Sequence, residues 1–475
     1  MTKKRYNNKN FIIEVTDEVI IPNTGIGLLS TILRSTHFLE RMNQLTVPSP
    51  HQKYANSDCL LSYLGLLFQG TNAFEEIDFH RNNPSYSYLL GVEAIPSKEI
   101  LRQRFDTLGK MKTYTPMIQK TIVEALRNSN VEILALTEVL PSQILYDENG
   151  RVRKVEKSDM IQLSKPRIPI DVDVSPFDNS NTKKEGVSLT YKKFVGYSPN
   201  FMYMGLEGYL INTELREGKD HVQKGTPEFL RKGLQLAQDI TDRPLCLRMD
   251  AGNDSKENMD ICKETQVDYI IKKNFRGTNP EDYYKLAKGP NVQATKVREG
   301  KMIYDFFHEV QRDGQWYKQA CRVTERTTKA DGQILLMPEE ELEVYWTTLD
   351  ETVECVIALY HNHAVCEQFH SEIKTDLDSE RLPSGKFETN QLVLQLTALA
   401  YNLLRIAGQI YLGHSKKNSG KKDNRSRIRM KSILKHIVYI ASKLVTSGRQ
   451  TIIKISRYTA ELKAFCHLNS VLQLE

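Results

Sequence analysis

The chain has 475 residues, of which 40% are hydrophobic and 26% charged, and its formal net charge is +6 at pH 7. This composition is typical of a folded protein rather than a disordered one, and the length predicts about two to four domains. No run of about 18 apolar residues and no apolar signal segment occurs, so we expect neither a membrane span nor secretion.

The seven scattered cysteines form no Cys-x-x-Cys pair, a pattern typical of a reduced, cytoplasmic protein. No glycine-rich nucleotide-binding motif occurs, so no nucleotide is expected as a partner. The charge is distributed unevenly. From Tyr411 onward, 14 lysines and arginines face three acids, a balance of +11, so the rest of the chain sums to −5. A basic end on a mildly acidic body indicates a polyanionic partner, most often nucleic acid.

Residues 1–130 are predicted to be mostly helical after a short strand-like start, because apolar residues recur at helical spacing. One of these helices is predicted after Ser97 as N-cap, with Gly109 as its end. A polar stretch within 131–165 reads as a linker to a different region.

From residue 166 the pattern changes to strands. The stretch "IPIDVDVS" alternates apolar residues with Asp171 and Asp173, and residues 200–215 predict a hairpin turning at Glu207-Gly208. A helix capped by Thr226, a short apolar strand ending in Asp250, a second helix and a further strand follow. The predicted order is therefore β-β-β-α-β-α-β, an antiparallel meander followed by parallel strands joined by helices.

Residues 276–340 are predicted to be a β-rich insertion with turns at Asp313-Gly314 and Asp331-Gly332. Trp316 lies beside the first turn. It either stacks on an unpaired or flipped DNA base or packs within the insertion, and the sequence leaves both alternatives open. Residues 342–349, with Trp346 in the core, are predicted as one more strand. A helix containing residues 360–374 and a long helix over 392–410 come next.

Three acids in this order can meet. In a sheet of the ribonuclease H type the first and fourth strands are neighbours, so Asp173 and Asp250 come together, and a helix across the sheet can add Glu367. Carboxylates gathered in this way need a cation, and Mg²⁺ prefers oxygen ligands. Two such ions activate a water or a 3′-hydroxyl and stabilise the leaving oxygen of a phosphodiester. Asp171 remains an alternative to Asp173 as the first ligand.

The stretch "YHNHAVCEQFHSEIK", residues 360–374, carries the third acid. At 100° per residue, Tyr360, His363, Glu367 and Lys374 fall on one outward stripe, while the opposite stripe is apolar and buried. An alternative interpretation is a zinc site made by His363, Cys366 and His370, for which the sequence offers no fourth ligand nearby.

These residues resemble the signature Tyr-x2-Arg-x3-Glu-x6-Lys of bacterial insertion-sequence transposases of the DDE type. Tyr360, Glu367 and Lys374 match it, whereas His363 stands where arginine is usual. Residues 171–205, 213–232 and 247–259 are similar to the blocks around the first and second catalytic aspartates of one such family, itself distantly similar to the piggyBac transposases. The resemblance covers about residues 60 to 460. The departure puts a phosphate contact at position 363 in question, because imidazole is mostly neutral at pH 7.

The resemblance implies an α/β fold: a ribonuclease H-like core (166–275 and 341–410) with the β-strand insertion, a helical DNA-end-binding region (1–130) and a basic helical C-terminal region (411–475). It implies that Asp173, Asp250 and Glu367 are the catalytic residues and the ligands of Mg²⁺, for which Mn²⁺ can substitute. It also implies cleavage of double-stranded DNA at the element ends and joining to target DNA, by a homodimer in a bacterial cytoplasm at the nucleoid. Asp173 ranks ahead of Asp171 because Ser175 follows it by two residues. The DNA contacts expected are Tyr360, His363, Lys374, Trp316, Lys421, Lys422, Arg425 and Arg427.

Two other functions remain as alternatives. One is a metal-dependent nuclease that cuts without joining, and the other is a DNA-binding regulator derived from a transposase with a dead site. Retention of all three acids argues against the regulator.

Overall fold

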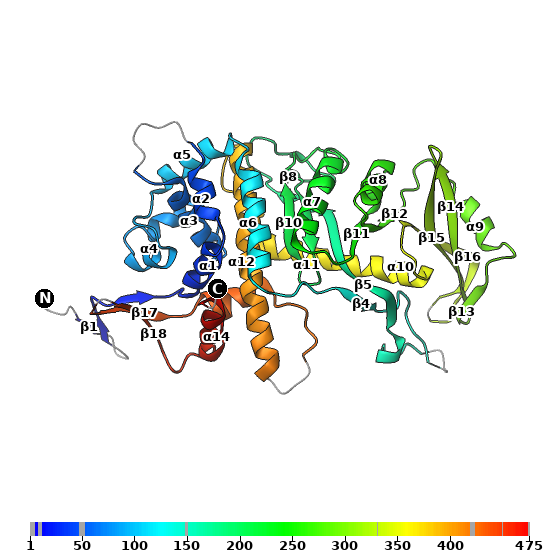
Figure 1. Ribbon diagram of the computed structural model, residues 1–475. Coiled ribbons are helices and arrows are strands. Elements are labelled where there is room, and N and C mark those ends of the chain that lie inside the picture. The colour runs from blue at the N-terminus through cyan, green and yellow to red at the C-terminus, as the bar shows by residue number, and fades with distance from the viewer. Residues whose placement is uncertain are drawn as a thin grey trace. The chain divides into compact units, whose positions relative to one another are not determined.

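The computed structural model describes residues 5–7, 12–46, 53–147, 151–329, 331–418, 423–448 and 450–473, and its elements are labelled in Figure 1. The chain divides into two compact units, one made of Met1–Val131 with Glu372–Glu475 and the other of Glu132–Ser371. It is a mixed α/β protein with several sheets, as predicted. None of the helices described is long and apolar enough to cross a membrane.

The unit Glu132–Ser371 is built on one large mixed sheet. Its strands are β4 (Leu136–Val139), β5 (Ile161–Val174), β9 (Asn200–Met204), β10 (Tyr209–Glu214), β11 (Leu245–Met249), β12 (Asp268–Lys272), β13 (Ala294–Arg298), β14 (Lys301–Arg312), β15 (Gln315–Thr328) and β16 (Ile334–Thr347). They lie in the order β10-β9-β5-β11-β12-β16-β15-β14-β13, with β4 paired to β5. A small sheet of β6 (Phe177–Asp178), β8 (Val195–Tyr197) and β7 (Ser188–Leu189) accompanies it.

The strand directions agree with the predicted meander and crossovers. β5, β9 and β10 are antiparallel neighbours, whereas β11 runs parallel to β5 and β12 runs parallel to β11. The turn between β9 and β10 includes Glu207 and Gly208, as predicted, and Gly208 has a positive φ of 72°. The helices α7 (Thr226–Ile240) and α8 (Lys256–Glu264) connect β10 to β11 and β11 to β12.

Helices cover both faces of this sheet, which is why every residue of β9 and β11 is buried. On one face, Gly233 of α7 lies directly against the side chain of Met202. On the other face, Phe369 of α11 (Cys366–Ser371) packs at a tilt against Tyr203, with the ring centroids 5.0 Å apart. Neighbouring residues of a strand point to opposite faces. Asp171, which is paired in register with Tyr203, therefore lies on the α11 face together with Asp173.

The insertion continues the same sheet (Figure 1), with α9 (Pro280–Ala287) packed on β14 and β15. Both predicted turns, at Asp313-Gly314 and Asp331-Gly332, join its long strands. β16 runs unbroken through residue 340. It pairs with β15 through Glu339–Thr347 and again at Ile334, with a register shift between the two, and with β12 through Tyr345–Thr347. The predicted strand 342–349 and the last strand of the insertion are thus one strand. Trp346 is fully buried within it, which confirms its place in the core.

The segment 353–376 is not the single regular helix that the sequence predicted. It consists of α10 (Val353–His361), a 3₁₀ turn η4 (Asn362–Val365), α11 and a π-helix η5 (Glu372–Asp376). A 3₁₀ turn winds more tightly than an α-helix, and a π-helix more loosely. Positions counted at 100° per residue therefore lose their phase, and His363 is 8% exposed instead of facing outward.

The other unit contains the 32-residue helix α12 (Phe387–Asn418), beside which α6 (Tyr114–Asn128) runs (Figure 1). Ser97 caps α5 as predicted, by accepting a hydrogen bond from the backbone N–H of Ile100 at 3.4 Å. Gly109 is the last residue of α5, as predicted. An added Cβ there would come within 2.8 Å of the Glu388 carbonyl, so the glycine also allows α5 and α12 to pack closely.

The C-terminal region is not entirely helical. It contains the hairpin β17 (Ser442–Ser447) and β18 (Gln450–Ile455), and β17 also pairs with β3 (Val19–Ile21). The remaining elements of this unit are β1 (Arg5–Asn7), β2 (Ile12–Glu14), α1 (Gly25–Arg34), α2 (Phe38–Asn43), α3 (Asn56–Leu67), η1 (Phe74–Phe79), α4 (Pro84–Leu90), α5 (Lys98–Gly109), α6 (Tyr114–Asn128), α13 (Met430–Ile433), the π-helix η6 (Leu434–Val438) and α14 (Leu462–Gln473).

Candidate active site

Two carboxylates meet where β5 and β11 end side by side. Asp173 is near the end of β5, and Asp250 follows β11 directly, one residue beyond the pairing of Met249 with Val172. The Asp250 carboxylate caps the 3₁₀ turn η3 (Ala251–Asn253) by accepting hydrogen bonds from the Gly252 N–H at 3.1 Å and the Asn253 amide at 2.8 Å. Both acids line a cavity of about 500 Å³.

The two carboxylates influence each other electrostatically. Burial raises the pKa of Asp250 above its ordinary value, and the negative charge of Asp173 raises it further. Burial also acts to raise the pKa of Asp173, but the hydrogen bond and charge of His370 and the charge of His363 outweigh it, so this pKa is lowered. The site therefore concentrates negative charge on oxygen atoms, which is the donor set that Mg²⁺ prefers.

Glu367, the third predicted acid, lies on α11 and is exposed to solvent. It stands four residues after His363 and three before His370, and both of these histidines are buried. His363 Nδ1 contacts Asp171 at 2.8 Å, and His370 Nε2 contacts Asp173 at 3.2 Å. The helix is thus fastened to β5 on both sides of Glu367.

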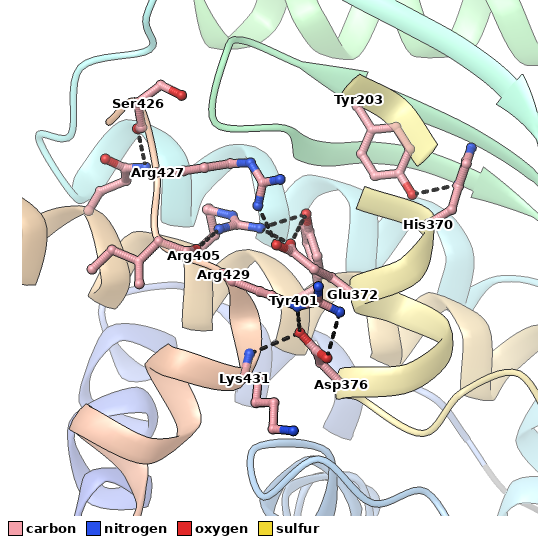
Figure 2. A network of polar contacts seen from close by, with 12 residues as sticks. Tyr203, His370, Glu372, Asp376, Tyr401, Arg405, Ser426, Arg427, Arg429 and Lys431 are labelled. Carbon is pink, nitrogen blue, oxygen red and sulfur yellow. Dashed lines mark hydrogen bonds and ion pairs between the residues drawn. The ribbon is translucent and has the colours of Figure 1, made fainter. Parts of the chain in front are cut away.

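His370 contacts polar side chains through both ring nitrogens. Its Nδ1 lies 3.1 Å from the Tyr203 hydroxyl, an interaction drawn in Figure 2. A carboxylate only accepts hydrogen bonds, so Nε2 must carry the proton that it donates to Asp173. The His370–Tyr203 contact therefore fixes the orientation of the ring that holds Asp173.

A buried cluster lies one pleat before the two acids. Arg248 and Asp171, paired in register, form a forked ion pair with Nε and Nη2 at 2.6 and 2.7 Å from the carboxylate oxygens. Arg248 Nη1 also donates to the Leu359 carbonyl at 2.8 Å and the Asn362 side chain at 3.0 Å. Burial would raise the pKa of Asp171, but the charges and hydrogen bonds of Arg248 and His363 lower it to about 2.

This cluster explains the place of His363, which was predicted to face outward. Its ring is buried against Asp171 and therefore does not lie on the exposed stripe with Glu367. Position 363 is where the resemblance expects an arginine. Here a guanidinium does reach this part of the helix, but it comes from Arg248 on β11.

Tyr360 lies close enough to Asp250 and Asp173 for their charges to act on its phenol. Burial raises the pKa of its phenol, and the charges of Asp250 and Asp173 raise it further, so the hydroxyl stays protonated at neutral pH. Tyr191, which lines the same cavity, has a pKa raised to about 12 by burial and then by the same two charges.

The residues that the structure brings together as possible zinc ligands differ from the predicted set by one residue: Asp171 replaces His370. Ligand atoms of Asp171, His363 and Cys366 lie within 4.8 Å of one another, whereas His370 contacts Asp173 instead. Both oxygens of Asp171 already accept from Arg248, and burial, followed by the charge of Asp171, raises the pKa of the Cys366 thiol well above its ordinary value. A zinc ion would have to displace a buried guanidinium and deprotonate a resistant thiol.

We therefore expect the purified protein to contain no stoichiometric zinc. Elemental analysis of the wild type and of Cys366→Ser checks this expectation. A molar equivalent of zinc in the wild type that is lost in the variant would contradict it.

The other predicted DNA contacts lie on different elements. Trp316 is 62% exposed at the start of β15, so it does not pack inside the insertion. Lys374 is on η5, in the unit that includes the C-terminal region. Lys421 and Lys422 lie outside the described residues. Arg425 is paired at the surface with Asp423 at 2.7 Å.

Arg427 is mostly buried, contrary to its expected place on an exposed basic surface. Its guanidinium and that of Arg405 bind the two oxygens of the buried Glu372, as Figure 2 shows. The Tyr401 hydroxyl also donates to Glu372 at 3.3 Å. Arg427 therefore stabilises the start of η5 rather than forming part of a solvated surface.

Sequence reasoning missed Arg248, Tyr191 and the role of His370. A signal for the first was present, because Arg248 precedes Asp250 by two residues just as Asp171 precedes Asp173. Residues two apart along one strand share a face. The register that brings Asp173 beside Asp250 therefore also pairs Asp171 with Arg248. Tyr191 lies in a loop, and no pattern pointed to it.

Comparison with known proteins bears on most of the chain. A family model described as Transposase DDE domain group 1 matches residues 154–475. No curated protein matches the chain. Among solved structures, the chain is similar to the piggyBac transposase in a synaptic complex with hairpin DNA, determined by cryo-EM. That alignment covers 88% of this chain and 79% of the other, at a TM-score of 0.39 and 10% identity. Because the family match extends over more than half of the chain and includes all three predicted acids, the protein belongs to the DDE transposases.

Proposed function

We propose that this transposase binds the ends of its own insertion sequence, cleaves them by two-metal-ion chemistry and joins them to target DNA. One observation carries the proposal. Asp173 and Asp250 lie at the ends of two neighbouring parallel strands and line one cavity, where their negative charges act on each other. The helix that bears Glu367 is fastened to the same strand by His363 and His370.

We further propose that the core of the unit Glu132–Ser371 is ribonuclease H-like. In support, three antiparallel strands are followed by two parallel ones in the order β10-β9-β5-β11-β12, with helices on both faces. This arrangement puts the first strand beside the fourth, as the proposed catalytic centre requires.

In this proposal Asp173, Asp250 and Glu367 hold Mg²⁺, with Mn²⁺ as a substitute. The bound ions supply Lewis-acid activation of a water or 3′-hydroxyl and stabilise the leaving oxygen. Asp171 is the weaker candidate for the first ligand, because Arg248 and His363 already occupy its oxygens.

The chain's own residues position the substrate and the ligands. His370 holds Asp173 in one orientation, and the protonated phenol of Tyr360 donates a hydrogen bond to a phosphate oxygen beside the scissile bond. Lys219 and Arg276 line the cavity and provide positive charge for the flanking phosphates. Lys374 contacts a phosphate as a point charge, and Trp316 provides an exposed ring on which a base can stack.

The proposed partner is double-stranded DNA, bound by two copies of the chain that each hold one element end, in the cytoplasm of a bacterial cell. A nuclease that cuts without joining is the nearest alternative, and it shares the same centre. A regulator with a dead site is less well supported, because all three acids are retained.

The wild-type protein tests this proposal with DNA that flanks its gene on both sides. We expect cleavage at the element ends in Mg²⁺ or Mn²⁺, none in EDTA, and products joined to a second DNA. End-labelled cleavage assays and sequencing of joined products measure both steps. Cleavage without joining would establish the nuclease, and specific binding without cleavage would establish the regulator.

A further inference from the structure

An exposed basic stripe follows α13 and η6 in the unit of the C-terminal region. Lys431, Lys435 and Tyr439 are exposed, and all three line the same groove, so they lie on one side of this segment. The other side is buried and apolar, and consists of Ile433, Leu434, Ile437 and Val438. The buried side packs the segment onto its unit and thereby holds the exposed stripe towards solvent.

The stripe forms one wall of a groove of about 960 Å³. The groove is lined by Lys431, Lys435, Tyr439 and Arg429, by Thr375 and Asp376 of η5, and by Gln69, Gly70 and Leu434. Tyr439 donates its hydroxyl hydrogen to the Gln69 carbonyl at 2.6 Å, which fixes the phenol as part of the wall. Every lining residue belongs to the same unit.

The lining is positively charged, and its one acid is engaged. Arg429 binds Asp376 through Nε at 3.0 Å and Nη2 at 3.2 Å, and the backbone N–H of Lys431 donates to the same carboxylate at 3.0 Å, as Figure 2 shows. Three cations and one carboxylate leave a net charge of +2 on the lining residues. An anion entering the groove therefore meets attraction that Asp376 only partly cancels.

We propose that this groove binds the phosphodiester backbone of DNA, continuing the strand that Lys374 contacts. This inference rests on the proposed function and names a surface for it. Lys374 stands immediately before Thr375 and Asp376 of the groove wall, on the same π-helix. The proposed phosphate contact at Lys374 is therefore next in the chain to two residues of the groove wall.

The shape and chemistry of the groove favour an extended backbone over a small anion. Its two lysines are separated by about one helical turn, roughly 5.4 Å, and so offer successive charges rather than one enclosing site. Lysine ammonium groups bind phosphates as point charges without reading the bases. The groove is therefore expected to add affinity on every DNA sequence.

The test compares two double variants that remove the same charge. Lys431→Gln/Lys435→Gln changes the groove. Lys454→Gln/Lys463→Gln changes two other exposed lysines of the C-terminal region that do not line it. Fluorescence anisotropy, in EDTA and from 50 to 200 mM salt, gives the Kd for a labelled end duplex and for an unrelated duplex.

We expect the groove variant to bind both duplexes on the order of tenfold more weakly, and its log Kd to depend on log salt with a slope smaller by about two. The control variant should retain the wild-type slope. Equal weakening in both variants, or none in the groove variant, would overturn the proposal. Thermal melting of both variants verifies that the fold is kept.

Failure of the groove and failure of the function are distinguishable. If the wild type cleaves and joins DNA while the groove variant binds normally, only the groove proposal is wrong. If the wild type binds DNA through the groove but never cleaves it, the proposed function fails and the groove stands.

Discussion

Asp250→Asn is expected to reduce cleavage of the element ends by at least about three orders of magnitude. The substitution keeps the shape of the side chain but removes the charge of a metal ligand, and a catalytic metal contributes several kcal/mol of charge stabilisation. Asp173→Asn and Glu367→Gln should have comparable effects. DNA binding should survive in all three, because affinity depends on phosphate contacts made elsewhere.

Single-turnover cleavage and anisotropy binding, measured on the same preparations, separate the two effects. Asp220→Asn is the matched control, since Asp220 lines the same cavity but is paired with Lys224 at 2.7 Å. It should retain cleavage within about tenfold. An Asp250→Asn protein that cut DNA at the wild-type rate would show that the catalytic centre lies elsewhere.

Arg248→Met is expected to destabilise the protein by about 3–5 kcal/mol, because it leaves the carboxylate of Asp171 buried without its main partner. The double variant Asp171→Asn/Arg248→Met should regain much of this loss, since it removes both charges. Urea unfolding of the three proteins measures the free energies of unfolding. A full-sized loss that persists in the double variant would mean that packing, rather than the unpaired charge, dominates.

The same ion pair should also affect catalysis, because it joins the two strands that carry Asp173 and Asp250. In the refolded double variant we expect a higher Mg²⁺ concentration for half-maximal cleavage. Arg167→Met is the matched control. Arg167 is equally buried, on β5, where it pairs with Glu351 and Asp268 at 3.0 Å, so its loss should lower stability without changing the Mg²⁺ requirement.

Acid should erase part of the difference between the wild type and Asp171→Asn. The pKa of Asp171 is about 2 in the folded chain, against about 3.9 in an unfolded one. Because the folded value is the lower, the carboxylate contributes fully above about pH 4 and loses its contribution as the pH falls towards 2. A stability difference that stayed constant over this window would contradict the assigned pairing.

The sheet could be predicted from sequence because its signals are local. Alternation, turn dipeptides and apolar runs mark each strand of the sheet around Asp173 and Asp250, and the order of the strands then brings the two acids together. The structure confirms these strands and their neighbours. The cap of α7 shows the limit of such signals. Gly225, with a positive φ of 72°, is the N-cap in place of Thr226, whose hydroxyl donates to the Val222 carbonyl.

The helix 353–376 could not be predicted in the same way, since its winding depends on distant partners. Periodicity assumes a constant rotation per residue, but His363 is drawn inward by Asp171, from 192 residues earlier in the chain. The charge of the C-terminal region misled for a related reason. A count of cations does not reveal that Arg427 and Arg429 form ion pairs with Glu372 and Asp376.

The continuity of β16 limits how this protein can be recombined with its relatives. A chimaera that replaced residues 276–340 would cut through the middle of β16, whose last residues, Tyr345–Thr347, pair with β12. The insertion is therefore not a detachable module, because its last strand, 14 residues long, is also a strand of the core sheet. Leu336 and Met337 stand exposed towards its far end, while its root lies beside β12, next to the strand that ends at Asp250. A substitution within Tyr345–Thr347 would therefore affect the core sheet and the insertion together, because these residues pair with β12 on one side and with β15 on the other.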